Sequence, residues 1–289
     1  MFDPSFLQKL DYLSLLSKRL HRGDIRGEHR TYRKGASLEF SDFRTYQPGD
    51  DFRYIDWSIF SRLDKLFVKL FSSEEDLTLH ILVDSSESMA FGHPRKIDYA
   101  CKVGAALGYI GIINLDRVGI TAFAESLGET LVPYRSRKHI FSLFNFFTNL
   151  ATKGSTSLSA SLSAYSRQAK RSGLAVVISD LLDPGGYKQG LLALMHRRFD
   201  VVLIQVLDQA EIEPPERGAV SLVDSESGRS EKITVDDQIL GIYRSKVSAY
   251  FSEIESFCLD HGVEYLRTIT AVPFEDLILK YLRQGVYLH

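Results

Sequence analysis

The stretch Leu77-Thr-Leu-His-Ile-Leu-Val-Asp84, which continues as Ser85-Ser-Glu-Ser-Met89, decides the fold and the candidate site of this chain. A mostly apolar run that ends on an acid is typical of a buried parallel strand entering a loop. The run Leu174-Ala-Val-Val-Ile-Ser-Asp180 has the same form. Because parallel strands share one carboxyl edge, we expect Asp84 and Asp180 to lie together at that edge.

Helical and strand patterns alternate through the whole chain after residue 76. Beyond the two runs above, the sequence predicts strands near 118–124, 129–134, 201–207 and 264–268, and helices near 95–114, 137–150, 157–172, 187–198, 236–261 and after Pro273. This alternation predicts an α/β fold with a doubly wound, mostly parallel sheet and helices on both faces. Between residues 214 and 235 the pattern breaks, and two short strands around Ser225-Glu-Ser-Gly228 predict a β-hairpin insertion at the edge of the sheet.

The first 75 residues have a different texture. An amphipathic helix is expected at the start, with apolar residues near one face: Phe6, Leu7, Leu10, Leu13 and Leu16. From about residue 20 to residue 73 the chain is rich in Arg, Gly and aromatic residues and shows little periodicity, so we expect an irregular segment. The sequence therefore predicts two parts, residues 1–75 and residues 76–289.

Composition excludes several classes of protein. The formal net charge is −2, which gives the whole chain no attraction to nucleic acid or to anionic membranes. No apolar run approaches the length of a membrane span, and the N-terminus lacks the apolar core of a signal peptide. The two cysteines, Cys101 and Cys258, both fall in predicted helices. We expect reduced thiols in the core of a cytoplasmic protein.

The polar residues that follow the predicted strands are candidate metal ligands. Asp84, Ser86 and Ser88 alternate along one tight loop, Asp180 ends the second run, and the hydroxyl-rich loop Gly154-Ser-Thr-Ser157 lies between them in sequence. Carboxylate and hydroxyl oxygens select hard cations, here Mg²⁺ with Ca²⁺ or Mn²⁺ as alternatives. Asp and Ser after a strand are also common helix caps, but the ordered occurrence of all three pieces favours a metal site. The loop ligand is Ser155, Thr156 or Ser157.

Neutral hydroxyl ligands leave a bound cation with net positive charge. Such a cation can accept one more carboxylate, and a protein partner can supply it. The sequence thus predicts metal-dependent binding rather than catalysis.

The residues Asp84, Ser86, Ser88, Thr156 and Asp180 resemble the metal-ion-dependent adhesion site of von Willebrand factor A domains. The resemblance implies that both aspartates act directly or through water, and that the serines and the threonine supply hydroxyl ligands. Ser179-Asp180-Leu181 stands where threonine-aspartate-glycine is usual, so the geometry after that strand is expected to differ.

A longer resemblance covers residues 20–90. Its motifs are Gly27-Glu-His-Arg-Thr31, Gly35-Ala-Ser-Leu-Glu-Phe40 and Arg44-Thr-Tyr-Gln-Pro-Gly-Asp-Asp-Phe-Arg-Tyr-Ile-Asp-Trp57. They resemble the prokaryotic family known as domain of unknown function 58. That resemblance implies a MoxR-type AAA+ ATPase, or its substrate, as partner in assembly or maturation of other proteins. Many relatives carry N-terminal membrane helices, and their absence here implies a cytoplasmic form.

The segment from Arg44 to Trp57 has two interpretations. Pro48-Gly-Asp-Asp51 is a turn signal, and the charged groups in and around it can pin the backbone by charge-assisted hydrogen bonds. The charged residues concerned are Arg44, Asp50, Asp51, Arg53 and Asp56. Trp57, the sole tryptophan, is expected to anchor the segment on the core. The segment is either a scaffold of this kind or a binding surface for the ATPase.

We therefore expect a non-enzymatic, divalent-cation-dependent protein-interaction module. A metal-dependent phosphoryl-transfer or hydrolytic enzyme is the first alternative. Against it, Ser86 stands where a phosphoryl-transferring aspartate pair needs a second Asp, and the chain has neither a glycine-rich phosphate loop nor a G-x-S-x-G elbow. The second alternative is nucleic-acid binding through the basic stretch 18–34, which lacks an aromatic stacking platform.

Overall fold

The computed structural model of the protein describes residues 2–23, 38–73, 77–214, 218–223, 228 and 230–283. The chain forms two compact units. The larger unit consists of Met1–Ile25 and Leu77–His289, and the smaller unit is Arg26–Asp76.

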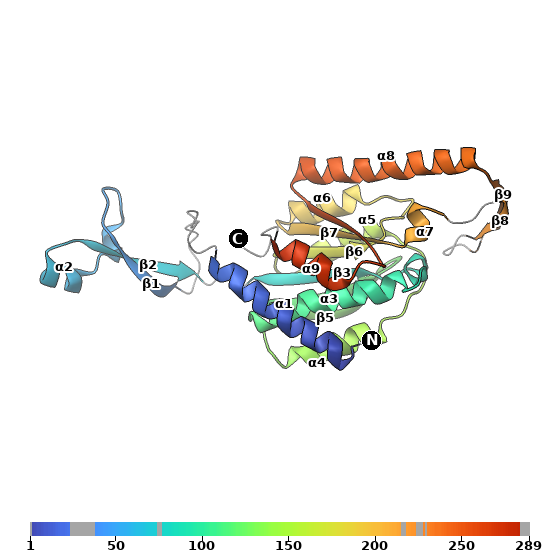
Figure 1. Ribbon diagram of the computed structural model, residues 1–289. Helices are drawn as coiled ribbons and strands as arrows, with labels where there is room; N and C mark the ends of the chain where they lie inside the picture. Colours follow the sequence, from blue (N-terminus) through green and yellow to red (C-terminus); the bar gives the residue numbers. More distant parts are fainter. Residues whose placement is uncertain are drawn as a thin grey trace. The chain divides into compact units, whose positions relative to one another are not determined.

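A six-stranded sheet lies at the centre of the larger unit, with strand order β10-β7-β6-β3-β4-β5 (Figure 1). The strands are β3 Thr78–Asp84, β4 Arg117–Phe123, β5 Leu127–Tyr134, β6 Leu174–Ser179, β7 Asp200–Leu207 and β10 Glu264–Ile269. All neighbours pair in parallel except β5, which is antiparallel to β4 at one edge. Every residue of β3 and β6 is buried, as the near-continuous apolar runs predict.

Helices cover both faces of this sheet (Figure 1). Successive β3 residues point to opposite faces, so Ile81 packs with one set of helices and Leu82 with the other. The first face carries α1 Pro4–Gly23, α3 Lys96–Ile113, α4 His139–Asn149 and α9 Phe274–Arg283, and the second carries α5 Leu158–Gln168, α6 Lys188–His196 and α8 Asp237–His261. The predicted α/β fold, a doubly wound and mostly parallel sheet with helices on both faces, is confirmed.

Helix α3 packs unusually close to α4. A Cβ atom added at Gly104 would stand 2.7 Å from Cζ of Phe147, and one added at Gly108 would stand 2.5 Å from Cδ1 of Leu143. These two glycines lie one turn apart and leave room for the α4 side chains. The first helix after the Asp84 loop is thereby fixed tightly in the core.

The expected boundary after residue 75 is wrong for the N-terminal helix, because α1 belongs to the larger unit. Phe6, Leu10 and Leu13 are buried in the same core cluster as α3 and α9. Leu7, which was expected on this face, is exposed. The hydroxyl of Tyr109 in α3 also donates a hydrogen bond to the α1 residue Asp11, 2.5 Å away. Burial of the apolar face assigns the helix to this core.

The smaller unit is more regular than the sequence predicts. Strands β1 Leu38–Thr45 and β2 Phe67–Ser73 pair in antiparallel register, with a bulge between Phe40 and Asp42. Between them lie a 3-10 turn at Phe52–Tyr54 and the short helix α2, Trp57–Leu63. The expectation of an irregular segment is therefore wrong for residues 38–73, because cross-strand pairing supplies order that a single strand's pattern does not reveal.

The predicted insertion near 214–235 is a β-hairpin. Strands β8 Gly218–Val223 and β9 Ser230–Val235 pair antiparallel to each other as a separate two-stranded sheet. A short helix that the sequence analysis did not predict, α7 Gln209–Ile212, lies between β7 and this hairpin. The hairpin thus follows directly from an element at the carboxyl end of the main sheet.

Candidate metal centre

Strand β3 delivers Asp84 to the carboxyl edge of the sheet, where its side chain has no exposed surface. One carboxylate oxygen accepts hydrogen bonds from the backbone N–H and the hydroxyl of Ser86, at 3.0 and 2.7 Å. The Ser86 hydroxyl is also 3.0 Å from the hydroxyl of Ser88. The loop therefore gathers the three alternating side chains that the sequence predicts as ligands.

The hydroxyl-rich loop lies against this first loop. The N–H of Glu87 donates to the carbonyl of Gly154 at 3.0 Å, and the N–H of Lys153 donates to the carbonyl of Ser85 at 2.8 Å. Within the second loop Thr156 is buried, Ser157 is half-buried and Ser155 is exposed. This order of burial favours Thr156 as the side chain that faces inward.

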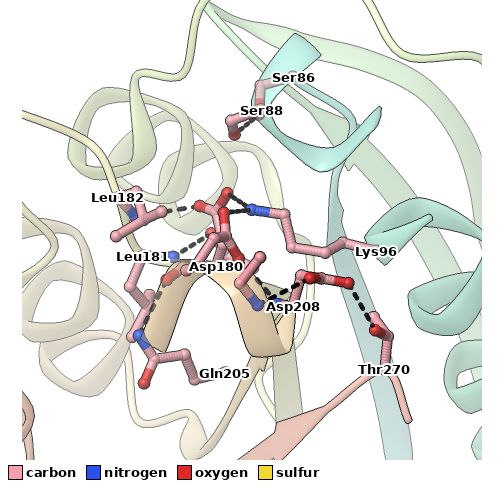
Figure 2. Close-up of polar contacts among 12 residues, drawn as sticks. Ser86, Ser88, Lys96, Asp180, Leu181, Leu182, Gln205, Asp208 and Thr270 are labelled. Atoms are coloured by element: carbon pink, nitrogen blue, oxygen red, sulfur yellow. Dashed lines mark hydrogen bonds and ion pairs between the residues drawn. The ribbon is translucent and has the colours of Figure 1, made fainter. Parts of the chain in front are cut away.

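Strand β6 brings the second acid to the same edge. The hydroxyl of Ser179 donates to the other carboxylate oxygen of Asp84 at 2.7 Å, so the two strand ends are hydrogen-bonded to each other. Asp180, the next residue, is buried, and its Oδ1 accepts from the N–H of Leu182 at 3.0 Å. Gln205 in β7 donates to the Asp180 carbonyl at 2.9 Å and fixes the backbone there (Figure 2).

The backbone after Asp180 adopts an unusual conformation. Leu181 has a φ of 62°, in the left-handed region that glycine enters easily and that costs other residues about 1 kcal/mol or more. Its side chain is buried, and its carbonyl accepts a hydrogen bond from the Tyr250 hydroxyl in α8. The turn therefore keeps a glycine-like backbone although the residue is leucine, and packing and hydrogen bonding hold it there.

Two buried carboxylates make this edge electrostatically demanding. Burial raises the pKa of Asp84 to about 7, and the nearby Asp180 charge adds to the rise against the hydrogen bonds from Ser179 and Ser86. A carboxylate held this way is stabilised by added positive charge. The site is therefore suited to a cation.

Lys96 is a member of this site that the sequence analysis missed. Its side chain, at the first residue of α3, is fully buried, and its ammonium lies 2.7 Å from Oδ2 of Asp180 (Figure 2). It also pairs with Glu211 in α7. Burial alone would lower the pKa of Lys96, but the charges of Asp180 and Glu211 outweigh it and raise that pKa. Lys96 is thus a buried, charged ammonium beside the candidate ligands.

Asp208 is a third acid that follows a buried strand. It ends β7 as Asp84 ends β3, and this repeated strand-acid pattern was the signal that could have found it. Its side chain caps α7 through the N–H of Ala210 at 2.9 Å, and it accepts a hydrogen bond from Thr270 at 3.2 Å. The Asp208 side chain is therefore engaged as a helix cap. For Lys96, by contrast, the sequence offers no signal beyond a basic residue at the start of an apolar helix.

The residues present fit a hard divalent cation. Asp84, Ser86, Ser88, Thr156 and Asp180 offer only oxygen, the donor that Mg²⁺, Ca²⁺ and Mn²⁺ prefer. Across the described ranges, no cluster of three or more His, Cys, Asp or Glu side chains is arranged to hold a metal ion. A site here would thus depend on hydroxyls as well as on two carboxylates.

The family described as Protein of unknown function DUF58 matches residues 42–249, most of both units. The chain belongs to this family. An uncharacterized protein of Mycobacterium tuberculosis (strain ATCC 25618 / H37Rv) is 30% identical over 260 residues, which cover 87% of this chain and 81% of that protein. An uncharacterized protein of Mycobacterium avium is 33% identical over 97 residues, which cover 34% of this chain and 57% of that protein.

Solved structures similar to this DUF58 chain share little sequence with it. The conserved hypothetical protein BatB from Bacteroides thetaiotaomicron is 15% identical with a TM-score of 0.45, over 72% of this chain and 99% of that one. The SpRpn10 VWA domain is 10% identical with a TM-score of 0.41, over 71% of this chain and 94% of that one.

The Arg44–Trp57 segment of this DUF58 protein is pinned by short-range charge pairs. Arg44 lies 2.8 Å from Asp50, which also accepts a hydrogen bond from the N–H of Gln47. Arg53 lies 2.6 Å from Asp51, whose side chain caps the 3-10 turn. Local pairs of this kind agree with the scaffold interpretation.

Asp56 and Trp57 begin helix α2. Asp56 caps the helix through the N–H groups of Ser58 and Ile59 and lies 3.0 Å from Lys69 in β2. Trp57 is 61% exposed and packs edge-to-face on Phe60, with ring centroids 6.2 Å apart. The expectation that Trp57 anchors the segment on the core is wrong, because its position at the start of α2 turns the ring outward.

The remaining predictions concern the cysteines, the basic stretch 18–34 and membrane-spanning helices. Both cysteines are buried free thiols, and burial raises the pKa of each to about 12. The side chains of the basic stretch 18–34 and of the motifs at 27–31 and 35–40 lie outside the described residues. Among the helices that the structure describes, none combines the length and apolarity that a membrane crossing requires.

Proposed function

We propose that this DUF58 protein is a non-enzymatic interaction module that binds a protein partner through a divalent cation. The single observation that carries the proposal is the buried Asp84, hydrogen-bonded to Ser86 and to Ser179 beside Asp180. Asp84, Ser86, Ser88, Thr156 and Asp180 would hold the cation, with Mg²⁺ as the first choice. When bound, the cation supplies a Lewis-acidic coordination position for a carboxylate of the partner.

The charges of the ligands favour a site that binds a partner's carboxylate over a site whose coordination positions are all filled by this chain. Asp84 and Asp180 together supply two negative charges, and the Asp180 charge is shared with the Lys96 ammonium. Two carboxylates just neutralise a divalent cation, and the hydroxyl ligands add no further negative charge, so the cation keeps a coordination position open to one more carboxylate. An acidic side chain of the partner would fill that position.

Two exposed apolar side chains accompany the polar site. Phe91, which follows the Ser88 loop, is 47% exposed, and Leu182, which follows Asp180, is 46% exposed. The Phe91 ring centroid lies 5.9 Å from the Lys96 ammonium, and the Leu182 N–H contacts Asp180, so both lie near the site. We expect the partner's carboxylate to be flanked by apolar residues that cover them.

The proposed partner is a MoxR-type AAA+ ATPase or a substrate of that ATPase, in the assembly or maturation of other proteins. The family resemblance implies this partner. The small unit offers a second surface for it around Phe52, Trp57 and Leu63, which are all exposed.

A metal-dependent hydrolytic or phosphoryl-transfer enzyme remains the alternative. It would need a nucleophile with a base beside it. Of the histidines in the larger unit, His80 lies on β3 and contacts the Tyr165 hydroxyl at 2.7 Å. Burial lowers its pKa to about 4, so it is placed as a packed neutral ring. Lys96 is held in two ion pairs.

A capture experiment tests the proposal. The full chain is immobilised and offered a purified MoxR-type AAA+ ATPase, with Mg²⁺ or with chelator. We expect Mg²⁺-dependent capture that Asp84→Ala abolishes. Asp98→Ala is the matched control, since Asp98 is an acid of α3 that pairs with the exposed Arg95 and lies outside the ligand set.

Three results would contradict the interaction module. Capture that is equal with chelator and with Asp84→Ala would remove the cation from the mechanism. Turnover of generic phosphate or ester substrates by the wild type, lost in Asp84→Ala, would favour the enzyme. Salt-sensitive retention on DNA would favour nucleic-acid binding through the basic stretch.

A further inference from the structure

Lys96 is a buried cation placed between two acids. Its ammonium contacts Asp180, which is a proposed metal ligand, and Glu211, which is not. Lys96 and Asp180 side chains are 0% and 1% exposed, and Glu211 is 17% exposed. The ammonium thus contacts both carboxylates at once.

The position of Lys96 is costly without these partners. It is the first residue of α3, where the helix dipole disfavours positive charge, and its side chain has no exposed surface. A buried ammonium therefore has to remain paired, and the free energy of its pairing depends on both acids. If Asp180 is drawn to another cation, Glu211 is the acceptor that is left.

Both carboxylate oxygens of Asp180 are hydrogen-bonded. Its Oδ1 accepts from the N–H of Leu182, and its Oδ2 accepts from Lys96. A divalent cation at Oδ2 would repel the ammonium that already contacts that oxygen. Lys96 and a divalent cation are therefore alternatives at the same oxygen.

Glu211 pairs with the ammonium, and other contacts hold its side chain in place. Its Oε2 accepts from the N–H of Asp208 at 2.8 Å in a capping box, while its Oε1 pairs with Lys96. The Tyr243 hydroxyl of α8 donates to its carbonyl, which ties α7 to α8. Glu211 keeps its place when Lys96 shifts, because these contacts do not involve the ammonium.

We propose that Lys96 is a built-in competitor for Asp180 that sets the affinity of the cation site. A bound cation would break the Lys96–Asp180 contact and leave the ammonium paired with Glu211 alone, so the occupancy of the site would change the charge pairing at α7. This inference rests on the proposed cation site and adds its regulation. A low intrinsic affinity follows, which makes the partner's carboxylate necessary for a stable complex.

Mn²⁺ binding to the full-length protein tests the competition, followed by electron paramagnetic resonance and by calorimetry. Lys96→Met removes the competitor, and we expect Mn²⁺ to bind on the order of tenfold more tightly or better. Glu211→Gln removes the alternative acceptor but keeps an oxygen for the capping box, and we expect weaker binding. Arg95→Gln, which removes an exposed cation next to Lys96, is expected to match the wild type.

The double variant Lys96→Met with Glu211→Gln separates competition from net charge. It has the same net charge as the wild type, yet it frees Asp180, so we expect it to bind Mn²⁺ more tightly than the wild type. It also avoids leaving Glu211 without the ammonium, which protects against misfolding of the single variant. Circular dichroism confirms the fold of each protein.

Two failures are distinguishable. If Asp84→Asn binds Mn²⁺ like the wild type, or if no variant binds at all, the proposed cation site itself fails. If binding depends on Asp84 but the double variant only equals the wild type, net charge explains the data and the competition is overturned. Equal binding by wild type and Lys96→Met overturns it as well.

Discussion

Asp84 should make the protein less stable in the absence of a cation, and Asp84→Asn should reverse this. Burial and Asp180 raise the pKa of Asp84 from 3.8 to about 7. The folded protein therefore holds a proton on Asp84 between these pH values, whereas the unfolded chain does not. The contribution of the Asp84 side chain to the free energy of unfolding is fully present below pH 3.8 and is lost as the pH rises through 7.

The size of the effect follows from this difference. About three pH units at about 1.4 kcal/mol each give an upper limit of roughly 4 kcal/mol above pH 8. Asn cannot accept the hydrogen bond from Ser179 at the second oxygen, which costs about 1 kcal/mol. We therefore expect Asp84→Asn to be about 1–3 kcal/mol more stable than the wild type at pH 8 in chelator, and no more stable at pH 4.

Urea unfolding between pH 4 and 8.5 measures this, with chelator and with Mg²⁺. Mg²⁺ should stabilise the wild type by about 2.7 kcal/mol at a hundredfold excess over the dissociation constant, and should leave Asp84→Asn unchanged. Glu264→Gln is the matched control, because burial alone raises the pKa of Glu264 to about 7 on β10, away from the proposed ligands. It should change the pH dependence and keep the Mg²⁺ response.

The reasoning is refuted if Asp84→Asn is less stable than the wild type at every pH in chelator. It is refuted equally if the pH dependence of the wild type persists undiminished in the variant, because only the part that other groups such as Glu264 contribute should remain. In either case the ionised Asp84 would stabilise the fold through its hydrogen bonds, and the unfavourable free energy assigned to burying its charge would be wrong.

Two further predictions concern the core. Burial lowers the pKa of His80 from 6.5 to about 4, so its contribution to the free energy of unfolding, up to about 3 kcal/mol, is present above pH 6.5 and is lost as the pH falls toward 4. We expect His80→Gln to flatten this acid dependence in urea unfolding. An unchanged slope would contradict the prediction. Gly104→Ala places a Cβ 2.7 Å from the Phe147 ring and should lower the free energy of unfolding by about 1–3 kcal/mol. Gly241→Ala, inside α8 with open space around it, should raise the free energy of unfolding by about 0.5–1 kcal/mol. Thermal unfolding that ranks the two variants the other way would refute the packing argument.

The parallel strands and their terminal acids were predictable because the signals are local. A continuous apolar run such as Leu174–Ile178 has few alternatives to a buried strand, and parallel strands must share one carboxyl edge. The convergence of Asp84 with Ser86 and Ser88 also follows from spacing along one loop. The choice among Ser155, Thr156 and Ser157 was not predictable, since it depends on which side chain the neighbouring loop covers.

The misplaced elements have a common cause. The α1 helix shows its apolar face in the sequence, but the pattern does not say which core that face covers. Trp57 is large and apolar, yet its place at the start of α2 leaves the ring exposed. Both outcomes depend on packing partners that are distant in the chain.

The parallel sheet, its helical layers and the oxygen-rich edge follow from local sequence, because hydrophobic periodicity and strand ends are properties of neighbouring residues. The place of Lys96 at this edge follows only from the fold, since its acid partners Asp180 and Glu211 lie 84 and 115 residues away. The same holds for the left-handed backbone of Leu181, which tertiary packing and the Tyr250 hydrogen bond maintain against its local preference. Charge pairing in a buried site depends on distances that no local pattern encodes.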